Sequence, residues 1–411
     1  MTDGEATETG VEPRARSAVR GRPAFWAAAA TILVLGWQIA TVQANYSGNC
    51  SGLFRTGAQI SVPPGLMATT YRDASPIGYD GQFYRFLSYD PWLRRETAAY
   101  LDDPHLRSYR ILVPALAWTI SGGQRKLIDD AYVLVLAMFI FAGVYWLGCL
   151  MVLEGRHAAY GLLFLAVPAT LISIDRMTVD VALAALTAGL ALQFARRREL
   201  WLWPILSAAA LARETGLLLI AGCALAALSR REFKKALAWF SAAIPALCWY
   251  GYLHYVLPPV AAERRVVPKW AIPSFHFGVL TRALDPPRYD LPHQQEVIAR
   301  GMDSLALLAM IATACLAVWL LRHTPDLWFR LVLGLQVALL VAMTSPAFWV
   351  TPFGYARVFG PLFVLVLSAS AARRLPWALA SATAFALMVD LRLSTELRSQ
   401  VYGVIRWLVG V

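Results

Sequence analysis

The sequence is poor in charged residues and lacks the signatures of several common enzyme classes. Only 15% of its residues are Asp, Glu, Lys or Arg, whereas 58% are apolar. It has no glycine-rich loop of the kind that cradles phosphates, no His-Glu-x-x-His and no Gly-x-Ser-x-Gly. These absences argue against an ATP-driven pump, a zinc protease and a serine hydrolase.

The sequence also lacks a cysteine framework and a nucleic-acid-binding pattern. Of its 5 cysteines, only Cys50 lies in a polar segment, so no set of disulfides is expected. The net charge is +11, but Arg and Lys gather at the ends of apolar segments and do not alternate with aromatic residues along a groove. We therefore expect no nucleic-acid partner.

Long apolar segments are abundant, and they decide the predicted fold class. A soluble chain of this length cannot bury so much apolar surface, and a helix needs roughly 20 apolar residues to cross a bilayer. We expect an all-α polytopic membrane protein with about 10–12 transmembrane helices. The clearest spans are 24–43, 131–153, 157–174, 179–195, 236–257, 303–321, 327–345, 357–372 and 376–390.

The positions of the basic residues predict the orientation. Residues 1–22 are polar with 4 arginines and are expected to form a disordered cytoplasmic tail, whereas 23–411 form one membrane domain. The positive-inside rule places the basic clusters in the cytoplasm and the loops 44–108 and 258–302 outside an inner (plasma) membrane. The first loop is too long for a passive connector, so we expect short helices in it.

Two segments do not fit simple spans. Residues 109–121 are apolar but short, so we expect them to dip into the membrane without crossing, unless one of the predicted spans is wrong. Residues 201–228 are long but interrupted by Arg213-Glu214-Thr215-Gly216, and basic clusters flank both ends. We therefore expect a hairpin of two short helices with Arg213 and Glu214 at its tip.

The stretch 78–85, Gly-Tyr-Asp-Gly-Gln-Phe-Tyr-Arg, is the strongest candidate for chemistry. Gly81 would allow unusual dihedral angles directly after Asp80, so the carboxylate could project into a cavity. A partly desolvated Asp beside the membrane is a usable general base, and aromatic residues such as Tyr84 offer flat surfaces to sugars. The alternative is a surface turn with aromatic residues at the membrane interface.

This stretch and the later string Tyr-Arg-Ile-Leu-Val-Pro at 109–114 resemble the GT-C superfamily of membrane glycosyltransferases, especially its bacterial members. The resemblance covers about residues 24–230. It implies a polyprenyl-phosphate sugar donor, a glycan, lipid or protein acceptor on the outer side, and Asp80 as the catalytic base. Some relatives carry Asp-x-Asp here, but Gln82 takes the second position, so no cofactor is expected and a divalent metal ion would lack its paired Asp.

Other charged residues beside apolar segments are candidates for substrate binding. Each of these residues also has an explanation that involves no substrate. Asp180 would favour the start of a helix, and Arg213 and Glu214 would form a buried ion pair. Arg357 and the basic second outer loop would contact lipid headgroups. With a lipid donor, one or more of Arg110, Arg213 and Arg357 would hold the leaving phosphate. The candidates are Gln82, Tyr84, Arg110, Asp175, Arg176, Asp180, Arg213, Glu214 and Arg357, together with Arg264, Arg265, Lys269, His276 and His293 of the second outer loop.

Two other functions are compatible with this sequence. A transporter or lipid flippase also uses broken helices and charges within the membrane, but such proteins usually show paired repeats, which we do not find here. A non-catalytic member of the same fold could help to assemble surface polysaccharide, with Asp80 retained for structure.

Overall fold

The chain is an all-α membrane protein, described here from a computed structural model that covers residues 21–258, 282–283, 289, 292–343 and 346–410. No strand occurs in these residues. Five helical stretches are long and apolar enough to cross a membrane, or up to 7 if each bent pair counts as one span. The 5 stretches are α2 (Pro23–Asn45), α6 (Ile128–Leu153), α11–α12 (Phe233–Val256), α14 (His293–His323) and α19–α20 (Pro376–Val409).

The remaining apolar helices are bent or short. Two pairs are bent, η4–α7 (Ala158–Ala166 and Pro168–Arg176) by 65° and α17–α18 (Pro352–Val358 and Gly360–Ala372) by 53°. The predicted count of 10–12 spans is reached only if the shorter apolar helices cross as well. These are α8 (Asp180–Ala195), α9 (Leu202–Ala212), α10 (Leu217–Ser229) and α15 (Leu327–Ala342).

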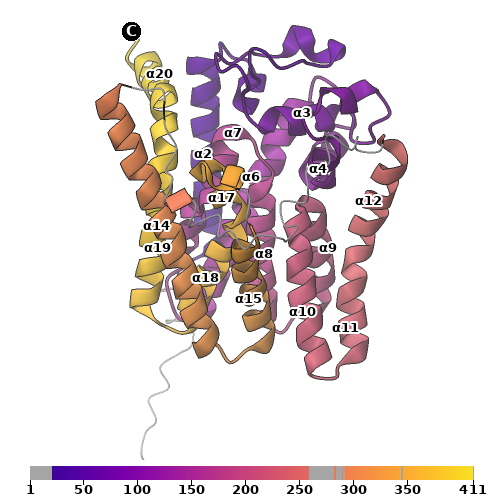
Figure 1. Cartoon of the computed structure of the whole chain (residues 1–411), viewed down its shortest axis with the longest axis vertical. Coiled ribbons are helices and arrows are strands. Elements are labelled where there is room, and N and C mark those ends of the chain that lie inside the picture. The colour runs from indigo at the N-terminus through magenta and orange to yellow at the C-terminus, as the bar shows by residue number, and fades with distance from the viewer. Residues whose placement is uncertain (1–20, 259–281, 284–288, 290–291, 344–345, 411) are drawn as a thin grey trace, which may run out of the picture.

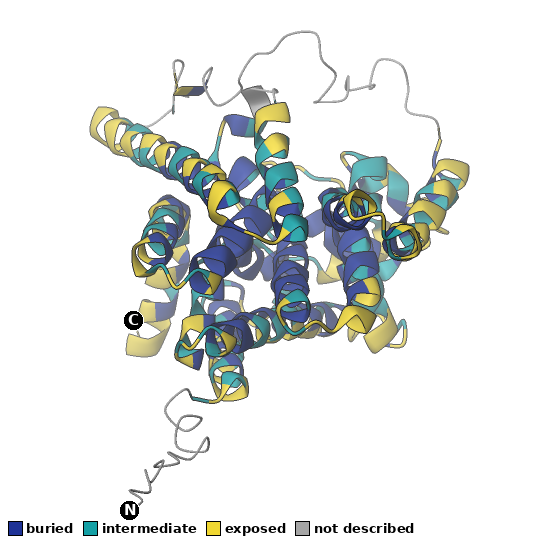
Figure 2. Cartoon of the chain, turned by 90° about the horizontal axis from the view of Figure 1, so that it is seen from below, coloured by how far each residue is buried: buried dark blue, intermediate teal, exposed yellow. Residues whose placement is uncertain are grey.

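Helices α8 and α18 are buried along almost their whole length, and Figure 2 shows that buried residues gather at the centre of the bundle. All residues of α8 from Asp180 to Gln193 are buried, as are Gly360–Ala371 of α18. The sequence of α8 is rich in Ala, and Gly189 lies so close to Trp146 of α6 that an added Cβ would be 2.8 Å from its ring. Small residues of this kind let membrane helices approach closely.

The basic turns after several helices meet at one end of the molecule. Arg197 after α8 and Arg373 after α18 line one hollow together with Glu154 and Asp326. The α10–α11 turn lies at the same lower end in Figure 1, whereas α3 and α4 lie at the upper end. These turns are three of the basic clusters that the sequence analysis assigned to one side of the membrane.

The loop 44–108 folds as short helices, as expected. They are η1 (Cys50–Phe54), η2 (Pro64–Thr69), α3 (Gly81–Tyr89), η3 (Glu96–Tyr100) and α4 (Pro104–Tyr109). The next helix, α5 (Leu112–Ile120), has 9 residues. Such a helix is about 13 Å long, too short to cross a hydrocarbon layer of about 30 Å alone.

The interrupted segment 201–228 forms the expected hairpin. Helices α9 and α10 are joined by the single turn η6 (Glu214–Gly216). A Cβ on Gly216 would lie 2.1 Å from the carbonyl oxygen of Ala209, so the tight turn requires glycine at this position.

The segment predicted as the second outer loop, 258–302, ends earlier than expected. Helix α14 begins at His293, whereas the sequence prediction placed the end of the loop at 302. The start of α14 is polar, His-Gln-Gln-Glu, and Pro292 precedes it as the N-cap, so the helix extends beyond the apolar segment that the prediction used.

Candidate functional site

Helix α4 brings two arginines to the start of α3. The Asp103 carboxylate accepts a hydrogen bond from the amide of Leu106 at 3.0 Å, and Pro104 occupies the first turn, so the helix begins at a well-capped position. Arg107 and Arg110 are three residues apart and therefore reach neighbouring points. Both guanidinium groups are buried.

Asp80, the residue before α3, lies between two arginines from distant parts of the chain. Arg107 donates a hydrogen bond to Asp80 through Nη2, 2.9 Å from Oδ1, and its Nη1 forms an ion pair with Oδ2 at 2.6 Å. Arg357 of α17 contacts the same Oδ2 through Nη1. Arg107 also holds Asp102 at 2.7 and 2.8 Å.

A second group of ion pairs lies beside the first, at the tip of the α9–α10 hairpin. Arg110 holds Glu214 in a two-point pair of 2.7 and 2.8 Å and donates to the hydroxyl oxygen of Tyr84 at 2.9 Å. Arg213 pairs with Asp180, the first residue of α8. Arg213 is 3.7 Å from Glu214, so its main partner is on another helix.

These contacts make two neighbouring groups, which meet where the guanidinium carbon of Arg107 lies 5.8 Å from the ring centre of Tyr84, and we call them together the Asp80 cluster. Most of its side chains are buried, whereas that of Asp102 is 46% exposed. Its members are Asp80, Tyr84, Asp102, Arg107, Arg110, Asp180, Arg213, Glu214 and Arg357. It brings together six of the residues singled out as substrate-binding candidates with Asp80. A site of this kind can hold an anion, because guanidinium groups bind phosphate oxygens in pairs.

The surroundings of Asp80 make it a weak base in this state. Burial raises the pKa of its carboxyl, but the charges of Arg357 and Arg107 outweigh burial and hold the pKa well below its usual range. A carboxylate with so low a pKa accepts a proton poorly. General-base chemistry at Asp80 therefore requires that these arginines take another partner.

Asp175 and Arg176 belong to a neighbouring group, not to the Asp80 cluster itself. Arg176 pairs with Asp175 at 3.0 Å and with Glu396 at 3.2 Å. Its guanidinium carbon lies 4.4 Å from the ring centre of Tyr79, and that of Arg357 lies 5.5 Å from the same ring. The ring of Tyr79 therefore contacts an arginine of each group and lies at the boundary between them.

Two residues of the stretch 78–85 have roles that differ from those expected. Gly81 is the first residue of α3 and has no positive φ, so the predicted unusual dihedral is wrong; Gly78 has the positive φ, +60°. The side chain of Gln82 points to other residues of the segment 44–108, where it accepts from the amide of Gly57 at 3.1 Å and donates to the carbonyl of Ile77 at 2.9 Å. It does not reach the Asp80 cluster.

Replacing Gly81 by alanine should destabilise the protein by about 1–3 kcal/mol, the usual range for overpacking. A Cβ at this position would lie 2.1 Å from the backbone carbonyl oxygen of Arg176, which cannot rotate away. Denaturant unfolding of the protein in mixed micelles measures the effect. The matched control is Gly36→Ala in α2, where a Cβ meets nothing within 4 Å. Equal stability of the two variants would contradict this interpretation.

The sequence interpretation missed Arg107, Asp102 and Tyr79. A signal for the first two was present, since Asp-Asp-Pro predicts a helix start and places Arg107 and Arg110 on one helical face. Tyr79 was considered only as a flat surface for a sugar or as an anchor at the membrane interface. Its hydroxyl group donates to the carbonyl of Phe353 at 3.1 Å and links the segment 44–108 to α17.

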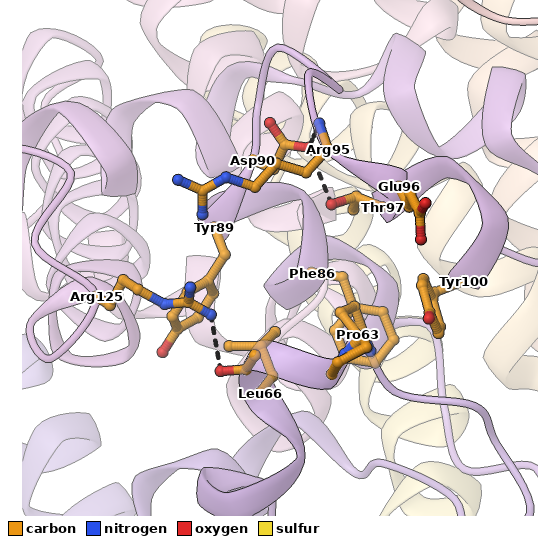
Figure 3. A pocket seen from close by; sticks show the side chains of 12 residues that line it. Pro63, Leu66, Phe86, Tyr89, Asp90, Arg95, Glu96, Thr97, Tyr100 and Arg125 are labelled. Atoms are coloured by element: carbon orange, nitrogen blue, oxygen red, sulfur yellow. Dashed lines mark hydrogen bonds between the residues drawn. The ribbon is translucent and has the colours of Figure 1, made fainter.

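A separate pocket of about 330 Å³ lies at the other end of α3 (Figure 3). Pro63, Leu66 and Phe86 line one part of it, and Tyr89 and Tyr100 stand on opposite sides. None of the predicted site residues lines this pocket.

The remaining candidates fall outside the description or form no site. Arg264, Arg265, Lys269 and His276 lie outside the described residues, and His293 is the first residue of α14. Among the residues that the structure describes, no group of three or more His, Cys, Asp or Glu side chains could hold a metal ion.

Comparison of the chain with protein-family models, with curated proteins and with solved structures finds no match.

Proposed function

We propose that this protein is a membrane glycosyltransferase that moves a sugar from a polyprenyl-phosphate donor to an acceptor on the outer face of an inner (plasma) membrane, with its N-terminus in the cytoplasm. The observation that carries this proposal is the Asp80 cluster, where a carboxylate of the first outer loop lies among buried arginines from α4, the hairpin tip and α17. The arginines suit a lipid phosphate, and the carboxylate suits an acceptor hydroxyl.

In the proposed reaction, the acceptor oxygen attacks the anomeric carbon while the bond from that carbon to the phosphate oxygen breaks. The electron pair leaves with the phosphate, which the arginines stabilise as its charge grows. The proton of the acceptor hydroxyl passes to Asp80 and then to water. A single displacement of this kind inverts the configuration at the anomeric carbon.

One observation favours a transporter or lipid flippase as the second candidate. Both bent helix pairs bring charged residues to the same region, because α7 ends at Arg176 and α17 carries Arg357. Broken helices beside charged residues are common in transporters.

Nanodiscs and sealed vesicles separate the two functions. A nanodisc has no second compartment, so a flippase has no net reaction to perform there, whereas a transferase does. We expect the purified protein in nanodiscs to release polyprenyl phosphate from at least one member of a panel of polyprenyl-phosphate hexoses and pentoses, in the presence of oligosaccharide, lipid and peptide acceptors. Movement of these lipids across vesicles with no release in nanodiscs would reject the transferase in favour of the flippase.

A further inference from the structure

The arginine pair on Asp80 has the properties of an anion site that an internal carboxylate occupies. Arg107 holds both oxygens of Asp80, and Arg357 contacts one of them from the opposite part of the chain. Carboxylate and phosphate groups both present oxygen pairs to a guanidinium fork. The carboxylate of Asp80 therefore lies where a phosphate group would be expected to bind.

Arg357 is the arginine of the cluster whose hydrogen bonds are least satisfied. Its Nε and Nη1 make no hydrogen bond among the described residues, and its one ion-pair contact is that of Nη1 with Oδ2 of Asp80. Arg110, in contrast, uses Nε, Nη1 and Nη2 on Glu214 and Tyr84. A buried donor without a partner costs free energy, so Arg357 has the most to gain from a ligand with several acceptor oxygens.

The Asp80 pair is also more open than the deeper pair in the hairpin. The side chains of Asp80 and Arg357 are 16% and 14% exposed, whereas those of Asp180 and Arg213 are 1% and 4% exposed. A ligand can therefore reach Arg357 and Asp80 more easily than it can reach Arg213.

We propose that Arg107 and Arg357 form the binding site for the phosphodiester group of the lipid-linked donor, and that Asp80 occupies this site until the donor displaces it. The inference rests on the proposed function. A phosphodiester carries one negative charge, as Asp80 does, so the exchange keeps the charge opposite the arginines unchanged. The released carboxylate of Asp80 is then free to accept a proton. Donor binding therefore converts Asp80 from a partner of the arginines into a general base.

Binding of polyprenyl phosphate to the protein in nanodiscs tests the exchange without any turnover. Asp80→Asn removes the competing charge, so it should bind polyprenyl phosphate at least about tenfold more tightly than wild type. Arg107→Gln should bind it at least about tenfold more weakly. The control Glu96→Gln, which changes an exposed carboxylate of the same loop, should bind as wild type does. Unchanged or weaker binding by a folded Asp80→Asn overturns the inference.

A second measurement uses only the wild-type protein, in case Asp80→Asn does not fold. Polyprenyl phosphate should increase the labelling of Asp80 by a water-soluble carbodiimide, because the carboxylate leaves its arginines, while uncharged polyprenol should have no effect. Labelling that falls or stays constant, or that polyprenol raises equally, overturns the inference. If inorganic phosphate at the same concentration acts equally, the site belongs to free phosphate and the lipid assignment is wrong.

These results are distinguishable from a failure of the proposed function. If polyprenyl phosphate exposes Asp80 but no sugar is transferred, the inferred binding site is supported and the proposed transferase activity is rejected. If sugar is transferred but Asp80→Asn binds polyprenyl phosphate no more tightly than wild type, the transferase activity is supported and the exchange of Asp80 for the donor phosphate is rejected.

Discussion

Asp80→Asn should lower the turnover of polyprenyl-phosphate sugar by at least about a hundredfold, the low end for removal of a general base. Asparagine keeps the size of the side chain but cannot accept the proton of the acceptor hydroxyl. Because the same change should tighten binding of polyprenyl phosphate, turnover and affinity should move in opposite directions. Release of polyprenyl phosphate from saturating donor in nanodiscs measures the effect.

The control for this prediction is Glu96→Gln, which removes a carboxylate from the same loop outside the Asp80 cluster. We expect it to retain wild-type turnover. If a folded Asp80→Asn also retains turnover, Asp80 is not the base, even if the protein is a transferase. The variants are compared at equal amounts of monodisperse protein, so that a loss of folding is not taken for a loss of catalysis.

Arg213→Ala should destabilise the protein by about 3–5 kcal/mol, the usual cost of leaving one member of a buried ion pair alone. Arg213 and Asp180 connect the hairpin tip to the start of the central helix α8, and both side chains are almost fully buried. The double variant Arg213→Met with Asp180→Leu should recover most of the loss, because no charge is then left unpaired. Denaturant unfolding in mixed micelles measures all three proteins.

An exposed ion pair provides the comparison. Lys235 lies 2.6 Å from Glu199 at the other end of the bundle, with side chains 33% and 54% exposed. Lys235→Ala should cost no more than about 1 kcal/mol, as is usual for surface pairs. If Arg213→Ala costs as little as Lys235→Ala, the hairpin does not depend on its buried pair, and the structural argument for the Asp80 cluster is weakened.

Much of the fold could be predicted from the order of apolar and basic residues. An apolar run long enough to cross a bilayer has few alternatives to a helix, since lipid offers no partner for backbone hydrogen bonds. The hairpin 201–228 followed from basic clusters at both ends and from Arg213-Glu214 in its middle. The shortness of α5 could also be predicted, because the apolar run at 109–121 is too short to cross a bilayer.

Partner choice and helix geometry could not be predicted in this way. Arg213 and Glu214 are adjacent in sequence, yet their main partners are Asp180 and Arg110, because helix packing and rotation decide which side chains meet. The bends before α7 and α18 are equally invisible in a hydropathy pattern. Arg107 was missed because it lies in a polar segment, where an arginine usually faces water, and only the fold buries it against Asp80.

A cryo-electron-microscopy structure of the protein with a non-cleavable polyprenyl-phosphonate sugar tests the central claim most directly. The account predicts that the phosphonate lies between Arg107 and Arg357, that Asp80 has left both guanidinium groups, and that its carboxylate faces the anomeric carbon. A phosphonate bound elsewhere, for example in the hollow lined by Arg197 and Arg373, with Asp80 still paired to Arg107, would contradict it.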